Sequence, residues 1–382
     1  MKKLLFLLIP IISLSLLSGC WDYKEIDEVA LVSAIAIDID SNTGEYLINV
    51  EIIDTEEGAS GPIFIPSLIE IRGETIYDAI RNTISLTTKK LYLSHASVVV
   101  VSEEFAKEGL TPILDWLSRH QEPRLTISIY VSKEDTARET LIKEPIRTKM
   151  RTFELKDIIK ANKYLAKSPN IQIFQITNQV QSKNIGSVLP IAVIVNINGK
   201  DTVRLQSSAY FSTDKLKGIF DPIDTMKYLF VKDQIDQGLL VIDMQGKDTK
   251  DKVTLEILKN KTKVDIEIQN QEIFFTVKIN TFVAIKEIDS GINYSDKNGR
   301  EVLKKKTENF LVKEIGEFIA SVQKETVDVL GFGNLLSKKY PDLWKSIEDD
   351  WDTIFKELNI DVVSKVKIMN SGHISSPISA GE

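Results

Sequence analysis

The sequence predicts a mixed α/β, multi-domain protein of the α+β kind, with antiparallel-rich sheets packed against helices. At 382 residues, the chain is long enough for about two to three domains of about 150 residues each. Hydrophobic residues make up 43% of it and charged residues 27%, a balance that excludes a disordered or multi-spanning membrane chain. Apolar residues alternate between strand-like and helical spacing along the chain, which indicates sheets covered by helices.

The first residues have the pattern of a bacterial lipoprotein signal peptide. Two lysines precede an apolar run, Leu4 to Leu17, which is shorter than the roughly 20 residues that a membrane-spanning helix needs. The run ends in a lipobox that consists of Leu17, Ser18, Gly19 and Cys20. The small residues Ser18 and Gly19 allow an extended backbone in a signal peptidase, and the thiol of Cys20 is the nucleophile that accepts a diacylglyceryl group. We therefore expect cleavage of residues 1–19 and an exported ectodomain that acylated Cys20 anchors in the membrane. A plain signal peptide with a chance cysteine is the alternative.

The first part of the mature chain predicts a β-hairpin. An apolar run, Val29 to Ile37, and a partly alternating segment, Tyr46 to Ile53, are typical of strands, and the polar residues between them of a turn. Asp38, Asp40 and Asn42 resemble a calcium loop. The required glycine is displaced by one position, however, and an asparagine stands where the bidentate glutamate should be, which favours a simple hairpin turn.

The rest of the N-terminal half alternates between helical and strand-like spacing. We expect helices at 76–87, 112–119, 135–143 and 153–166, and strands at 97–101, 125–131 and 189–197. This order suggests a layered α/β unit. The Asn198-Gly199 turn is a candidate boundary, so residues 20–199 are predicted to form an N-terminal mixed α/β region, with two subdomains as one option.

Residues 200–371 predict a C-terminal α+β domain. We expect strands at 203–211, 239–244, 253–258, 263–268, 273–283 and 360–368, and helices at 224–230, at 300–329 and from Pro341 onward. Strands in a run argue for antiparallel pairing. The last helix carries an apolar stripe at helical spacing, formed by Trp344, Ile347, Trp351, Phe355 and Leu358. Such a stripe is typical of core packing, with a partner or ligand surface as the alternative. Residues 372–382 are small and polar, and we expect a frayed tail.

The sequence contains no motif that carries catalytic or metal chemistry. It lacks a phosphate-binding glycine loop, a Gly-x-Ser-x-Gly elbow and a His-Glu-x-x-His pair, since its three histidines stand far apart, at 95, 120 and 373. We interpret His95 as a hydrogen-bonded structural residue at a strand entrance, with a catalytic base as the alternative. A net charge of −7 argues against a nucleic-acid partner. We therefore predict no catalytic residue, cofactor or metal site, and the ligand-binding residues stay unknown.

Several short motifs, taken in their order along the chain, resemble those of a known family. The matching residues are Gly19-Cys20-Trp21-Asp22 with Glu25-Ile26, Val32 to Asp38, Leu91 to His95, Arg119 with Glu122 and Arg124, Ala209 to Phe211 with Asp214 to Leu216 and Gly218, and Asp328 with Gly331 to Gly333, Tyr340-Pro341, Trp344, Trp351 and Phe355. The chain resembles the C-subunit lipoproteins of spore germinant receptors, the Ger(x)C family. That family usually has glycine where this chain has Ala34, Ala36 and Ser94, which affects packing detail more than membership.

The resemblance implies a lipid-anchored, non-enzymatic subunit of a spore nutrient-germinant receptor. It implies a position on the extracytoplasmic face of the spore inner membrane, beside two integral-membrane receptor subunits, and a role in starting germination. It assigns no catalytic residues. The alternatives are a solute-binding lipoprotein of a membrane transporter and a lipid-anchored envelope enzyme. A solute-binding protein needs two doubly wound parallel lobes, against which the run of strands after Leu239 argues.

Overall fold

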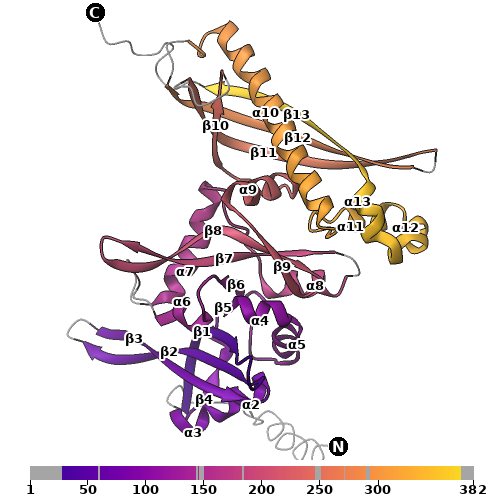
Figure 1. Ribbon diagram of the computed structural model, residues 1–382. Helices are drawn as coiled ribbons and strands as arrows, with labels where there is room; N and C mark the ends of the chain where they lie inside the picture. Colours follow the sequence, from indigo (N-terminus) through magenta and orange to yellow (C-terminus); the bar gives the residue numbers. More distant parts are fainter. Residues whose placement is uncertain are drawn as a thin grey trace, which may run out of the picture.

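The computed structural model describes residues 28–58, 61–142, 145, 150–182, 185–245, 251–270, 272–289 and 293–370. Within these ranges the chain forms two sheets with helices packed on them, and the second sheet lies at one end of the molecule (Figure 1). This arrangement confirms the predicted mixed, multi-domain architecture. The signal peptide at 1–19, the lipobox with Cys20 and the tail at 372–382 are predictions that fall outside the described residues.

The first sheet has nine strands and is mixed. Its order is β3-β2-β1-β5-β6-β7-β8-β9, and the short β4 also pairs with β1. The strands are β1 (Val29–Ile39), β2 (Tyr46–Gly58), β3 (Gly61–Gly73), β4 (Lys90–Tyr92), β5 (Val98–Val101), β6 (Ser128–Ser132), β7 (Ser187–Ile197), β8 (Lys200–Ser212) and β9 (Lys215–Phe220). The central strands β1, β5, β6 and β7 run parallel, and antiparallel hairpins flank them on both sides. The β1–β2 pairing confirms the predicted hairpin.

The pattern did not predict β3, the edge strand of this sheet. Pro62 and Pro66 interrupt its sequence, and proline cannot donate a hydrogen bond to a neighbouring strand. At an edge, however, only one side of the strand is paired, so proline is tolerated there. The position in the sheet therefore explains why a strand forms despite its sequence.

Helices cover both faces of the first sheet. They are α2 (Ile76–Asn82), α3 (Ile84–Thr87), α4 (Glu103–Glu108), α5 (Thr111–Arg119), α6 (Ala137–Ile142), α7 (Arg151–Ala161) and α8 (Ile173–Val180), with short 3-10 turns at Leu93–His95 and Asn162–Tyr164. On one face, Ala34 and Ala36 of β1 pack with side chains of α6 and α7. On the other face, Ile35 and Ile37 pack with side chains of α2, α4, α5 and α8. Because both faces are buried, β1 reads as a nearly continuous apolar run.

The predicted boundary at Asn198-Gly199 is the turn of a hairpin within the first sheet. Ile197 pairs with Lys200 across it, and both β7 and β8 continue the sheet. The sheet ends with β9, after which α9 (Pro222–Val231) leads toward the second sheet. The division of the chain at residue 199 therefore stays a prediction, and the sheets themselves divide after Phe220.

The second sheet has the order β10-β11-β12-β13. Its strands are β10 (Gly238–Asp243), β11 (Lys252–Gln269), β12 (Glu272–Asp289) and β13 (Asn359–Asn370). The first three pair antiparallel, as predicted, and β13 returns parallel to β12. The prediction of two separate strands at 253–258 and 263–268 was wrong. The polar residues between them remain in the ladder because Asn260 donates to the hydroxyl of Thr262 at 3.1 Å and accepts from that of Thr281 at 2.8 Å.

The helix α10 (Lys297–Lys324) lies along the second sheet (Figure 1), and its apolar stripe packs against that sheet. The side chain of Asp296 caps its first turn by accepting from the backbone N–H of Gly299 at 2.6 Å. The buried residues of the stripe are Leu303, Thr307, Leu311, Ile315, Phe318, Ile319 and Val322. They share one core with both sheets, since Val188, from β7, belongs to the same buried cluster as Phe275, from β12.

The segment after α10 forms three short helices, of which the last two replace the single helix that was predicted from Pro341 onward. They are α11 (Phe332–Lys339), α12 (Pro341–Ile347) and α13 (Trp351–Glu357), with a 3-10 turn at Glu348–Asp350 before the last. The prediction of one continuous helix from Pro341 was therefore wrong. The predicted core packing is confirmed, because Trp351 and Phe355 are fully buried and the ring of Trp344 lies 5.1 Å from that of Trp351.

Candidate functional site

A cavity of about 910 Å³ opens beside β4, where motif residues from separate segments meet. Its lining comprises Val29, Leu31, Tyr77, Ile80, Arg81, Ile84, Lys90 to His95 and Arg119 to Glu122. The segment from Leu91 to His95 forms the end of β4 and a 3-10 turn, while Arg119 and Glu122 stand at and after the end of α5. The fold therefore assembles one surface from two motifs that are separated in the sequence.

Polar contacts hold these two segments together. The ammonium group of Lys90 lies 2.7 Å from the carboxylate of Glu122, and the hydroxyl of Ser94 donates to the carbonyl of Glu122 at 3.0 Å. Ser94 stands where the Ger(x)C pattern usually has glycine, and its hydroxyl makes a hydrogen bond that glycine could not make. Because both contacts converge on one residue, Glu122 fixes the distance between β4 and the end of α5.

Aromatic rings and exposed charges give the cavity its chemical character. The ring of His120 lies 5.0 Å from that of Tyr77 and 5.2 Å from that of Trp116. His95 is exposed, with its ring 5.8 Å from that of Tyr92, and its structural role stays a prediction. Such a lining suits the binding of a polar ligand or a protein side chain through stacking and hydrogen bonds.

A second group of motif residues centres on Asp328, a fully buried carboxylate. It accepts hydrogen bonds from the backbone N–H groups of Gly331 (2.7 Å), Phe332 (3.0 Å) and Gly333 (2.7 Å), and from the indole N–H of Trp351 (3.2 Å). Gly331 has a φ of 77°, which glycine adopts without strain. The carboxylate therefore joins the start of α11 to the start of α13. This link is the structural reason why Asp328, the two glycines and Trp351 occur together in the motif.

Close packing and charge reinforce the Asp328 cluster. A Cβ atom on Gly333 would lie only 2.8 Å from the ring of Trp344, so a larger residue does not fit there. Burial raises the pKa of Asp328. The backbone N–H donors and the charge of Lys232 lower this pKa, but they do not offset the effect of burial. Burial lowers the pKa of Lys232, whose ammonium group donates to the carbonyl of Leu330 at 3.0 Å. Together these contacts tie α9 to the loop before α11.

The motif around Asp214 connects the β8–β9 turn to α5. The carboxylate of Asp214 accepts from the backbone N–H of Thr111 at 3.2 Å and from its hydroxyl at 2.5 Å. A Cβ atom on Gly109 would lie 2.7 Å from this carboxylate. A Cβ atom on Gly218 would lie 2.5 Å from the hydroxyl of Tyr210, so the glycine makes room for that ring. The motif residues in this region therefore also hold helices and strands in position.

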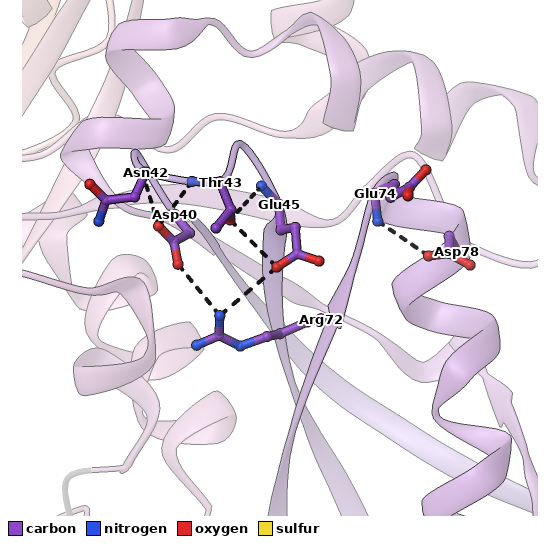
Figure 2. Close-up of polar contacts among 7 residues, drawn as sticks. All are labelled: Asp40, Asn42, Thr43, Glu45, Arg72, Glu74 and Asp78. Carbon is purple, nitrogen blue, oxygen red and sulfur yellow. Dashed lines mark hydrogen bonds and ion pairs between the residues drawn. The ribbon is translucent and has the colours of Figure 1, made fainter.

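The acidic loop after β1 forms a hairpin turn, as predicted. Figure 2 shows that the carboxylate of Asp40 accepts from the backbone N–H groups of Asn42 (3.0 Å) and Thr43 (3.4 Å). These donors, first that of Asn42, lower the pKa of Asp40. The guanidinium of Arg72, from β3, lies between Asp40 (3.4 Å) and Glu45 (4.0 Å). The loop is thereby closed by its own backbone and by an ion pair.

Asp38 takes no part in that turn. Its buried carboxylate accepts from the backbone N–H groups of Ala137 at 2.6 Å and Arg138 at 3.3 Å, at the start of α6. Burial raises the pKa of Asp38 in spite of these donors. Across the described ranges, no three His, Cys, Asp or Glu side chains come close enough to hold a metal ion.

A buried polar cluster lies beneath α7 and was not predicted from the sequence. The carboxylate of Glu51 accepts from the hydroxyls of Ser33 (2.5 Å) and Thr152 (2.6 Å), and Arg151 forms an ion pair with Glu154. Burial lowers the pKa of Arg151. An alternating strand such as the one that contains Glu51 normally exposes its polar face to solvent. Here α7 covers that face, and only the tertiary structure reveals it.

The predicted lipidation site, Cys20, and the lipobox residues Leu17, Ser18 and Gly19 lie outside the described residues. In the part of the chain that the structure describes, no helix is both long and apolar enough to cross a membrane.

Comparisons with known proteins agree with the order of the motifs. Residues 22–194 match the family model described as the spore germination protein N-terminal domain, and residues 206–372 match the one described as spore germination B3/GerAC like, C-terminal. Spore germination protein KC of Bacillus subtilis (strain 168) is 26% identical over 401 residues, covering 99% of this chain and 98% of that protein. Spore germination protein B3 of the same organism is 23% identical over 364 residues, covering 94% and 95%.

A solved structure has the same fold. The crystal structure of the GerBC protein matches with a TM-score of 0.58 and 18% identity, and the match covers 91% of this chain and 100% of that one. The two family models follow each other along the chain in the order that their descriptions give, N-terminal and then C-terminal. The chain therefore belongs to the Ger(x)C family of spore germination proteins.

Proposed function

We propose that this protein is the lipid-anchored, non-enzymatic subunit of a spore nutrient-germinant receptor. It would lie on the extracytoplasmic face of the spore inner membrane, held there by acylated Cys20, and act beside two integral-membrane receptor subunits. The observation that carries the proposal is the pair of spore germination family models, which match consecutive parts of the chain from residue 22 to residue 372.

The structure agrees with a role in binding and positioning rather than in catalysis. The motif residues around Asp328 and Asp214 connect helices and strands through hydrogen bonds, which are buried around Asp328 and exposed at Asp214. Those around Glu122 line an open surface with aromatic and charged groups, which suits contact with another molecule. The antiparallel pairing of β10, β11 and β12 speaks against two doubly wound lobes, and so against the solute-binding alternative.

The function is tested with spores that lack this protein. They should fail to respond to at least one nutrient, yet germinate normally when a downstream, nutrient-independent trigger is applied, because a receptor subunit acts upstream of that trigger. The measurement is the loss of optical density of a spore suspension under both conditions. Failure under both would indicate a general envelope defect and contradict the proposal.

The anchor is tested with a matched pair of lipobox variants. Cys20→Ser removes the thiol that would be acylated, so the chain should stay uncleaved, incorporate no labelled fatty acid and support germination poorly. Ser18→Ala keeps a small residue before the cleavage site and should be processed like the wild type. Normal processing and labelling of Cys20→Ser would refute the anchor.

A further inference from the structure

The end of the molecule opposite to the second sheet carries a group of exposed basic side chains, although the whole chain is acidic. This end consists of α2, α3 and the start of β4 (Figure 1). The stretch from Ala79 to Ser102 contains no Asp or Glu but includes Arg81, Lys89 and Lys90, all exposed. Two exposed carboxylates, Glu74 and Asp78, stand before this stretch, Asp78 in the first turn of α2 (Figure 2). Lys90 is partly neutralised by its ion pair with Glu122, so Arg81 and Lys89 contribute most of the positive charge.

Apolar side chains project from the same end. Leu86 is 63% exposed, Tyr77 45% and Ile84 40%. The guanidinium of Arg81 lies 5.6 Å from the ring of Tyr77, so charge and apolar surface are adjacent. We call Tyr77, Arg81, Ile84, Leu86 and Lys89 the basic tip. Exposed apolar side chains next to basic ones are the combination that binds at the interface of an anionic bilayer.

A lipid on Cys20 would hold the basic tip close to the membrane, because the chain enters the fold beside this tip. The first described strand begins at Val29, and Val29 pairs directly with Lys90. If Cys20 carries the lipid, residues 20–28 form the whole tether to this point, and even fully extended they span only about 30 Å at roughly 3.4 Å per residue. The tether therefore keeps the basic tip at a high effective concentration near the bilayer, where a weak contact suffices.

We propose that the basic tip docks on the surface of an anionic phospholipid bilayer, with Leu86 and Ile84 in the interface and Arg81 and Lys89 at lipid phosphates. This inference rests on the proposed lipid anchor. The docked tip is a second membrane contact, and it fixes the orientation of the ectodomain, which the lipid anchor alone leaves free to rotate.

The test uses the mature, acylated protein reconstituted in vesicles. Cys20 is the only cysteine and its thiol is consumed by the lipid, so Leu86→Cys introduces a single free thiol for an environment-sensitive fluorophore. The matched control is Val302→Cys on α10, since Val302 is 56% exposed and belongs to the helix that covers the second sheet. The vesicles contain phosphatidylcholine alone or with phosphatidylglycerol, with or without brominated lipids as quenchers.

We expect the probe at position 86 to shift to shorter wavelength and to be quenched by brominated lipid in the phosphatidylglycerol vesicles, and the probe at position 302 to do neither. Adding Arg81→Glu and Lys89→Glu should lower the equilibrium constant for docking at least roughly fivefold per charge. Equal behaviour of the two probes in protein that floats with the vesicles would overturn docking but leave the anchor intact. A shift that depends on protein density without quenching would indicate a second copy of the chain and also overturn it. Protein that fails to float overturns the anchor and, with it, the docking.

Discussion

Replacing Asp328 by asparagine would isolate the hydrogen bonds that hold the C-terminal helices together. The substitution preserves the shape of the side chain but converts one acceptor oxygen into an N–H donor. One carboxylate oxygen accepts from Gly331 and Phe332, and the other accepts from Gly333 and Trp351. In either orientation of the amide, two buried donors therefore lose their acceptor and face another donor.

The expected cost follows from these two donors. An unsatisfied buried donor costs about 1 to 3 kcal/mol, so two such donors cost about 2 to 6 kcal/mol. The ammonium group of Lys232 donates to the carbonyl of Leu330 and acts on Asp328 only as a nearby charge. We expect Asp328→Asn to lower the free energy of unfolding by about 3 to 5 kcal/mol, a large part of the typical 5 to 15 kcal/mol of a domain.

Equilibrium denaturation in urea, followed by tryptophan fluorescence, measures this change. Two of the four tryptophans of the chain, Trp344 and Trp351, lie in the same cluster and report on it directly. The matched control is Asp342→Asn in the first turn of α12, where the side chain is exposed and the change should stay within about 0.5 kcal/mol. A loss below about 1 kcal/mol for Asp328→Asn, with an unchanged dependence on urea, would refute the reasoning.

Three further substitutions test other parts of the structure. Trp351→Ala should cost about 3 to 5 kcal/mol and reduce protein abundance; a variant that melts like the wild type but fails to signal would show that the stripe is an interaction surface. Gly218→Ala places a Cβ against the ring of Tyr210 and should lower the melting temperature by the equivalent of about 1 to 3 kcal/mol, whereas Gly316→Ala in α10, with open space around its Cβ, should not lower it. Hydrogen bonds from two lysines hold the pKa of Glu103 below its ordinary 4.5. Above pH 4.5, Glu103→Gln should therefore lower the free energy of unfolding by up to about 1 kcal/mol. This difference between variant and wild type should vanish as the pH falls through the lowered pKa. Denaturation curves at several pH values would show a constant difference if this assignment is wrong.

Local patterns predicted the helices and strands in which apolar residues occupy the buried positions. The strand that begins at Val29 is apolar on both faces because helices cover both, and the long helix that covers the second sheet shows its stripe at helical spacing. The patterns failed where tertiary position decides the outcome. Pro62 and Pro66 are compatible with a strand only at the edge, and Asn260 is compatible with a buried ladder only because Thr262 and Thr281 supply its partners.

The residues of the candidate site could be identified from the sequence, but their assembly into one surface could not. The motif from Leu91 to His95 and the motif around Arg119 and Glu122 are visible in the sequence, while their meeting across one cavity depends on the parallel pairing of β4 with β1. Single-sequence patterns do not determine the partner of a three-residue strand, because its few side chains give little information on register. The cluster under α7 was missed for a related reason, since a polar strand face looks the same whether solvent or a helix covers it.

The structure divides the family motif residues into two groups with different physical explanations. The side chains of Asp328, Trp351 and Phe355 are buried, and their hydrogen bonds and packing account for their presence in the motif. His95 and Arg119 are exposed at the cavity, where packing contributes little and a substitution usually changes stability by less than about 0.5 kcal/mol. Packing therefore does not explain why such side chains belong to a motif. A loss of germination caused by changing them, with normal protein abundance, would have to arise from contact with another molecule, and the cavity beside β4 is where that contact would lie.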